Sequence, residues 1–201
     1  MKKLLAIIAL VVLGATSTYA QLGLRAGVNF DNISKKEDVD LDKKTGFHIG
    51  AVYNIDLIGG FALEPGFYFT QKGFKLNDDD ANMNYLEVPV NVKFKMVDLS
   101  ALALDAHIGP FAALGLGGKW KTDIAGEKED VKMFDSGEDG MGCKRFDFGL
   151  QMGLGAVILN KIYAGVNYDM SLTKIDADLG IGKDNLKESN HVWMISVGLN
   201  F

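Results

Sequence analysis

The sequence predicts an all-β fold, an eight-stranded antiparallel transmembrane β-barrel, and three observations support that prediction. Apolar and polar residues alternate with period two in eight segments, as they do in strands whose two faces meet different surroundings. Short and long connections alternate between these segments, as at the two ends of a membrane barrel. The last segment ends on Phe201, and a terminus that frays needs no ordered alternation.

The front of the chain has the three parts of a secretory signal peptide. Lys2 and Lys3 are followed by an apolar run from Leu4 to Leu13, and Ala20 closes a small-residue cleavage site. The run is too short to span a bilayer as a helix, which takes roughly twenty residues. We therefore predict a cleaved signal peptide over residues 1–20 and a barrel domain over residues 21–201; the alternative is a buried N-terminal helix.

The composition excludes several classes of protein. Without Lys2 and Lys3 the chain would carry 19 basic and 26 acidic residues, against 21 and 26 in the full sequence. This acidic balance argues against a nucleic-acid partner, which calls for a basic face. Cys143 is the single cysteine, so no internal disulfide is possible. We expect no cofactor, no metal site and no catalytic use of the Cys143 thiol.

The first four segments each place apolar side chains on one face. In residues 21–30 the even positions are apolar and the odd ones are polar or glycine. In residues 45–56 the odd positions from 47 to 55 are apolar, opposite histidine, glycine and asparagine. Residues 61–70 repeat this pattern, with Pro65 as the exception. Residues 85–96 are the clearest strand, because every even position is apolar and the other face carries glutamate, asparagine and two lysines.

The second four segments continue the pattern to the C-terminus. Residues 102–117 set mainly apolar even positions against aspartate, histidine and glycine. Residues 146–158 and 162–173 have apolar even positions opposite aspartate, asparagine, glutamine and glycine. In residues 193–201 the odd positions, from tryptophan to phenylalanine, are apolar. This last strand must pair with residues 22–30, because an open sheet edge is not tolerated in lipid.

The connections place the two ends of the barrel. Three are short, at residues 56–60, 97–100 and 160–161, whereas four are long and charged, at residues 31–44, 73–84, 118–144 and 176–190. With an even number of strands, both termini lie at the short-turn, periplasmic end, and the four long loops face the outside.

A soluble eight-stranded barrel is the main rival, because it would show the same alternation with the apolar face turned inward. Glycines crowd the polar face, and a small barrel needs small residues where space is tightest, which is inside. Aromatic residues gather near both ends of the apolar face, as in interfacial girdles. They are Phe30, Phe47, Phe69, Phe146 and Trp193 toward the loops, and Tyr53, Phe61 and Phe201 toward the turns.

Three prolines interrupt the predicted strands: Pro65, Pro89 and Pro110. Proline cannot donate a hydrogen bond to the strand ladder, and a closed barrel has no edge on which to place it. We expect a β-bulge at each proline, or a partner strand whose unpaired groups are satisfied by water.

The sequence resembles the PorT-like, "porin family" outer-membrane β-barrel proteins of Bacteroides-group, Gram-negative bacteria. The stretches that carry the resemblance are 24–30, 85–93, 109–111, 146–150 and 197–201. The resemblance implies a cell outer-membrane location and a barrel of OmpA or OmpX size, but it brings no catalytic residues with it. Its partners would be outer-membrane lipid and lipopolysaccharide, the barrel-assembly machinery through the strand ending at Phe201, and an extracellular protein at the loops.

Charged residues of both signs share the polar face, and these are the candidate site residues: Arg25, Glu64, Glu87, Lys93, Asp105, Asp147 and Asp169. Glu64, Lys93 and Asp105 lie on neighbouring strands and would form a row of ion pairs. Burying such charges is costly unless they are paired, and eight strands leave an interior just wide enough for side chains. We expect a structural plug; the alternative is a narrow, gated path for small solutes.

Two weaker candidates concern the loop end. His191 lies beside Ser189 and is the one plausible seed for a lipid-modifying or proteolytic enzyme, which would need a histidine at the outer rim. Acidic runs at 78–80, 127–130, 135–139 and 176–178 offer carboxylates of the type Ca²⁺ prefers, but their spacing is not that of an EF-hand. We expect solvated loop charge here, and a structural or surface-interaction role for the protein as a whole.

Overall fold

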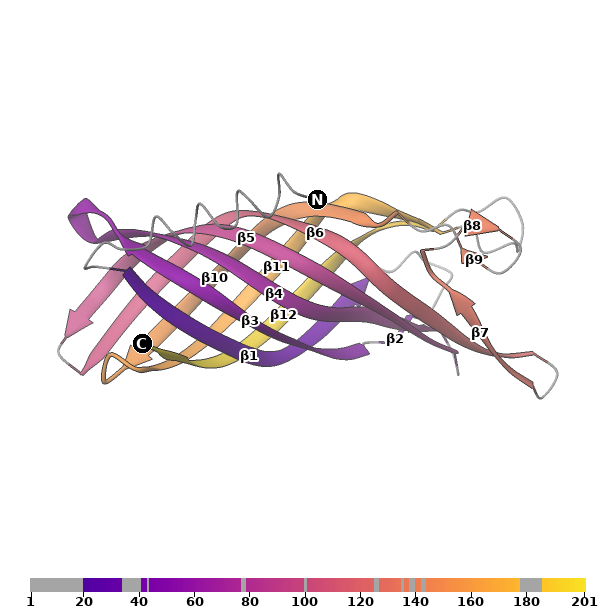
Figure 1. Ribbon diagram of the computed structural model, residues 1–201, viewed down its shortest axis with the longest axis horizontal. Coiled ribbons are helices and arrows are strands. Elements are labelled where there is room, and N and C mark those ends of the chain that lie inside the picture. Colours follow the sequence, from indigo (N-terminus) through magenta and orange to yellow (C-terminus); the bar gives the residue numbers. More distant parts are fainter. Residues whose placement is uncertain are drawn as a thin grey trace.

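Eight long strands close into an antiparallel barrel in the computed structural model of the protein (Figure 1). The strands are β1 (Ala20–Ile33), β3 (Lys44–Asp56), β4 (Phe61–Leu76), β5 (Asp79–Leu99), β6 (Leu102–Ile124), β10 (Phe146–Ile158), β11 (Ile162–Ala177) and β12 (Leu186–Asn200). Each pairs with the next, β12 pairs with β1, and the β6–β10 pairing completes the ring. The predicted fold class is therefore confirmed.

The structure describes residues 20–33, 41–42, 44–76, 79–99, 101–124, 127–134, 136–137, 140–141, 144–177 and 186–201. The predicted signal peptide lies outside these residues, apart from Ala20. Within the described part of the chain, no helix is long and apolar enough to cross a membrane.

Side-chain burial shows that the polar face points inward. Along β1 the even positions are exposed, with Leu24 at 49%, while Arg25 and Asn29 are at 3% and 0%. The same inversion holds on β12, where Val197 is 60% exposed and Ser196 is 3% exposed. A soluble barrel would bury the apolar face instead, so the rival fold is excluded and the outer wall suits lipid.

The aromatic residues form the two expected girdles. Toward the loop end, Phe47 and Phe69 approach to 5.9 Å between ring centroids on adjacent strands. Toward the turn end, Phe61 and Phe94 approach to 5.1 Å. The backbone nitrogen of Phe201 donates to the Leu22 carbonyl at 2.8 Å, which fixes the C-terminus beside the first strand at the turn end.

Several strands run further than the sequence predicted. Residues 73–84 were expected to form a loop, but β4 and β5 pair from Gly73↔Asn82 to Leu76↔Asp79. β6 similarly continues past residue 117, where it pairs with β5 and then with β7 (Glu127–Lys132) beyond the barrel rim (Figure 1). The predicted loop bounds were therefore too wide, because backbone pairing continues above the membrane where apolar alternation is no longer required.

Short elements complete the fold at its two ends. β2 (Leu41–Asp42) pairs with β4, and β8 (Ser136–Gly137) and β9 (Gly140–Met141) extend the sheet beyond β7. A 3₁₀ turn, η1 (Ile58–Gly60), joins β3 to β4. Gly59 and Gly60 adopt φ of 71° and 82° there, a conformation that favours glycine.

The strand register does not change at the prolines, so the expectation of a bulge at each one is wrong. Pairing of β3 with β4 skips Pro65 and resumes in the same register, and the β4–β5 ladder does the same at Pro89. The β5–β6 ladder does so at Pro110. The described register shifts lie elsewhere, between Asn84 and Tyr85 and between Lys95 and Val97 on β5, and between Met170 and Lys174 on β11. At each proline the ladder omits the hydrogen bond that proline cannot donate, and no additional residue is inserted as it would be in a β-bulge.

Candidate functional site in the barrel lumen

The row of charges predicted from neighbouring strands is present at the turn end of the lumen. The Lys93 ammonium lies 3.0 Å from Glu64 and 3.5 Å from Asp105. Arg25 adds a second cation 4.0 Å from Glu64, and its guanidinium lies 3.8 Å from the centroid of the Tyr163 ring. All four charged side chains are at most 7% exposed, so the two cations and two carboxylates offset one another where water is scarce.

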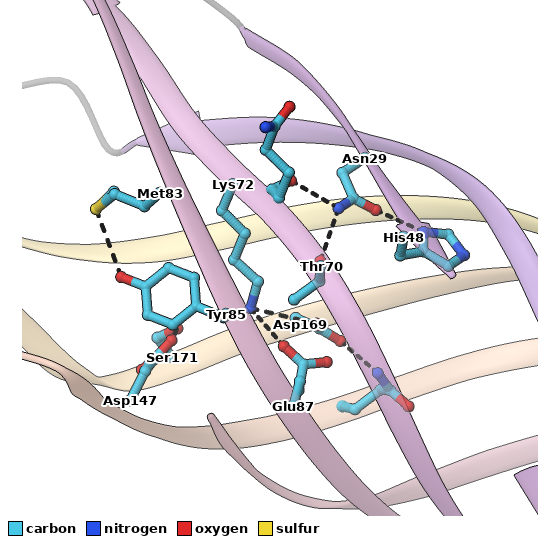
Figure 2. A network of polar contacts seen from close by, with 12 residues as sticks. Asn29, His48, Thr70, Lys72, Met83, Tyr85, Glu87, Asp147, Asp169 and Ser171 are labelled. Carbon is cyan, nitrogen blue, oxygen red and sulfur yellow. Dashed lines mark hydrogen bonds and ion pairs between the residues drawn. The ribbon is translucent and has the colours of Figure 1, made fainter. Parts of the chain in front are cut away.

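A second layer of charge lies in the middle of the lumen and centres on Lys72 (Figure 2). Its ammonium lies 2.7 Å from Glu87 and 3.8 Å from Asp169, and these three side chains are 0–1% exposed. Gln151 donates a hydrogen bond to Asp169 at 2.8 Å, and Asn91 donates to Gln151 at 2.7 Å. The chain of contacts therefore crosses the lumen from β4 through β5 and β11 to β10 and back to β5.

Lys72 was not among the residues predicted from the sequence. The predicted third strand ended at residue 70 and the next loop began at residue 73, so Lys72 was assigned to neither. The sequence did contain a signal for Lys72. Even-numbered residues of this strand, such as Glu64 and Thr70, face inward, and Lys72 is the next even-numbered residue. Asp147, which was predicted, accepts hydrogen bonds from Ser171 at 2.9 Å and from Thr173.

A third polar cluster, contributed by β1, β3 and β12, joins Asn29, His48 and Ser196. His48 Nδ1 lies 2.7 Å from Asn29 Oδ1, and Nε2 lies 2.9 Å from Ser196 Oγ. The Asn29 amide nitrogen donates to Thr70 Oγ1 at 2.9 Å (Figure 2) and to two backbone carbonyls. Its oxygen is therefore the acceptor, so His48 Nδ1 donates to it and Nε2 accepts from Ser196.

This order of contacts is that of a nucleophile, a base and an orienting amide. The surroundings argue against catalysis, because Ser196, His48 and Asn29 are only 3%, 1% and 0% exposed. A nucleophile needs space for a substrate and donors aimed at the developing oxyanion, whereas the backbone around Ser196 is committed to strand pairing. The arrangement is best explained as satisfied interior hydrogen bonding.

Glycines allow these side chains to meet across an intervening strand. In the register, Gly27 of β1 lies between His48 of β3 and Ser196 of β12. Gly153 of β10 lies in the same way between His107 of β6 and Asn167 of β11. His107 Nε2 reaches Asn167 Oδ1 at 2.7 Å over this gap. In both places a side chain on the glycine would occupy the path of the hydrogen bond.

Of the remaining candidates from the sequence, the structure describes the side chain of His191. His191 stacks on Tyr168, with ring centroids 5.9 Å apart, and Trp193 lies 4.9 Å from the same tyrosine. This places His191 within the outer aromatic girdle. The side chains of Ser189, Cys143 and the acidic runs lie outside what the structure describes. Among described residues, no group of three or more histidine, cysteine or acidic side chains is arranged to hold a metal ion.

Comparison with known proteins gives the family and the fold. The sequence model described as "Outer membrane protein beta-barrel domain" matches residues 15–177. Among curated proteins, no relative matches the sequence. The solved structure of the outer membrane protein OprG from Pseudomonas aeruginosa is similar, with 15% identity, a TM-score of 0.51, and 91% of this chain and 96% of that chain covered. A major outer membrane protein from Thermus thermophilus has 11% identity and a TM-score of 0.51, covering 90% and 99%.

Proposed function

Because the chain belongs to the family of outer membrane protein β-barrel domains, we propose that its lumen is a structural plug and that its role lies in the surface it presents. The barrel is a protein of the outer membrane, and the role that we assign to it is structural or surface-interaction. We favour a barrel with a closed interior. The alternatives are a barrel with a narrow path for solutes and an enzyme with its active site at the outer rim.

The observation that carries the proposal is the pairing inside the barrel. The lumen holds an Arg25–Glu64–Lys93–Asp105 layer at the turn end and, further toward the loops, a Lys72–Glu87–Asp169 layer and the Asn29–His48–Ser196 cluster. Side chains that must leave their ion pairs to admit a solute are expensive to move. In addition, the interior of an eight-stranded barrel is only wide enough for the side chains that fill it.

The proposal extends to the route of the protein and to its partners. Residues 1–20 would act as the export signal, and the last strand, ending at Phe201, would be read by the barrel-assembly machinery. The motifs at 85–93 and 197–201 favour the PorT-like proteins of the Bacteroides group as the specific branch. The segments beyond the outer girdle are the surface at which an extracellular protein would bind.

Planar-bilayer recording tests the plug. We expect the purified protein to show no open events of porin size. A variant in which serine replaces all seven charged residues of the two ion-pair layers should conduct weakly, because no ion pair then closes the lumen, and this variant also shows that inserted protein is detectable. Heat-modifiable mobility on gels verifies that both proteins are folded. Porin-size events in the wild-type protein would refute the plug and favour the small-solute channel.

A further inference from the structure

The middle charge layer of the lumen contains two carboxyl oxygens that no described group satisfies. Lys72 donates to Glu87 Oε2 at 2.7 Å, and Gln151 donates to Asp169 Oδ1 at 2.8 Å. The other two oxygens, Glu87 Oε1 and Asp169 Oδ2, are buried and have no hydrogen-bond donor among the described residues. Asp169 Oδ2 lies 3.8 Å from the Lys72 ammonium, which is too far for a hydrogen bond. A buried acceptor without a donor is costly, so this pair needs a further hydrogen.

The Glu87 and Asp169 side chains, from β5 and β11, meet inside the barrel beside the Lys72 ammonium (Figure 2). Their carboxyl groups are within hydrogen-bonding reach of each other, and both side chains are 0% exposed. Ionised carboxylates only accept hydrogen bonds, so a bond between these two groups requires a proton on one of them. Two carboxyl groups that share a site with little water do not both ionise readily.

The other groups around the pair leave this part of the lumen short of positive charge. The charged and titratable groups that act on the pair or on Lys72 are Tyr68 of β4, Tyr85 of β5, Asp147 of β10 and Asp31 of β1, which Lys44 of β3 also attracts. β6 contributes the Phe111 ring, and β12 contributes the apolar Val192 and Met194. Asp147 already accepts hydrogen bonds from Ser171 and Thr173. One described ammonium, that of Lys72, therefore faces both Glu87 and Asp169.

A proton suits this pair better than a metal ion. On β5, Tyr85 lies one inward position nearer the loops than Glu87, and its ring packs edge-to-face on Phe134 with 5.7 Å between centroids. Tyr85 and Phe134 are 2% and 6% exposed, so aromatic rings close the loop side of the pair. A metal ion needs more oxygen ligands than the two free ones, whereas a proton needs two acceptors and almost no volume.

We propose that Glu87 and Asp169 form a proton-binding site and share one proton at neutral pH. Asp169 carries it on Oδ2 and donates to Glu87 Oε1, because the Lys72 ammonium lies nearer to Glu87 and favours the charge there. This single hydrogen satisfies both acceptors that lack a donor. The site goes beyond the proposed plug, because it follows from the contacts of the pair whether or not the lumen conducts, and it makes the stability of the barrel depend on pH.

Infrared spectroscopy of the full mature protein, refolded in phosphatidylcholine vesicles, tests the shared proton. At neutral pH the wild-type protein should show the carbonyl band of a protonated carboxylic acid, and Asp169→Asn and Glu87→Gln should each remove the pair's contribution to it. The first change puts an amide donor in place of the proton, and the second leaves Asp169 as the acidic partner of Lys72, which then ionises it. Glu64→Gln is the matched control and should keep the band, because the Glu64 carboxylate lies beside two cations.

The pH dependence of urea unfolding is an independent measurement. Free aspartate and glutamate are ionised at neutral pH, so the unfolded chain lacks the proton that the folded pair holds. Stability should therefore fall as the pH rises. Between about pH 6 and pH 8, the unfolding constant of the wild type should rise about tenfold more per pH unit than that of Asp169→Asn.

Three results would overturn the proposal. They are equal pH dependence of the wild type and Asp169→Asn, a carboxylic acid band that Asp169→Asn leaves unchanged, and a wild-type protein without the band at neutral pH. The last result needs no variant, so the test holds even if a substitution prevents folding. It would favour two ionised carboxylates bridged by a water molecule, which give neither the band nor the additional pH dependence.

Discussion

Replacing Lys72 by methionine should destabilise the barrel more than any comparable change of a lysine on its surface. Lys72 lies 2.7 Å from Glu87 and 3.8 Å from Asp169, with all three side chains 0–1% exposed. At an effective dielectric constant of about 20, the attraction at the shorter distance is about 6 kcal/mol. Part of it is offset by the cost of removing the charges from water, so losing one partner of a buried pair typically costs about 3–5 kcal/mol.

The matched control is Lys95→Met. Lys95 lies 3.2 Å from Asp56, a distance similar to that of the buried pair, but both side chains are about one third exposed, at 33% and 34%. Solvent screens such a pair, so its loss should cost less than about 1 kcal/mol. The two variants differ chiefly in the burial of the ion pair they break.

Urea unfolding of the protein in phosphatidylcholine vesicles, followed by tryptophan fluorescence, measures both free energies. We expect Lys72→Met to lose about 3–5 kcal/mol. The triple change Lys72→Met, Glu87→Gln and Asp169→Asn should recover most of this loss, because no carboxylate then remains unpaired. A Lys72→Met loss as small as that of Lys95→Met would refute the electrostatic reasoning.

Three further results are expected. Gly27→Ala should cost about 1–3 kcal/mol in the same assay, because its Cβ would overlap the carbonyl oxygen of Ile195, whereas Gly117→Ala, with open space around its Cβ, should be neutral. Deleting Phe201 should lower the fraction of protein folded in the outer membrane, seen by heat-modifiable mobility, while protein refolded in vitro keeps nearly its full stability. His191→Ala should leave lipid A and protease profiles unchanged; an altered profile would restore the rim-enzyme hypothesis.

The alternation of residues was enough to predict the eight strands, because period two is a direct property of strand geometry. The glycines on the polar face and the aromatic residues at both ends of the apolar face then predicted which face points inward. Alternation also placed Glu64, Lys93 and Asp105 on adjacent strands facing one interior. Predicting these contacts required only the order of the strands, because the three residues lie at similar distances along their strands from the short turns.

The contacts that escaped prediction depend on register and on strand length. Ser196 and His48 meet because both are level with Gly27, and their alignment depends on the stagger around the barrel, which alternation alone does not give. Lys72 escaped because apolar alternation stops near residue 70, although the backbone ladder continues to Leu76.

The skipped pairs at the prolines give the barrel wall an uneven stiffness. Pro65, Pro89 and Pro110 lie on three consecutive strands, and their interruptions follow one another across the β3–β4, β4–β5 and β5–β6 ladders. On the opposite flank, pairing of β1 with β12 is unbroken from Gly23 to Ile33. When lateral pressure from the bilayer changes the cross-section from round to oval, the wall should bend along the proline diagonal and keep its curvature where the chain's two ends are joined.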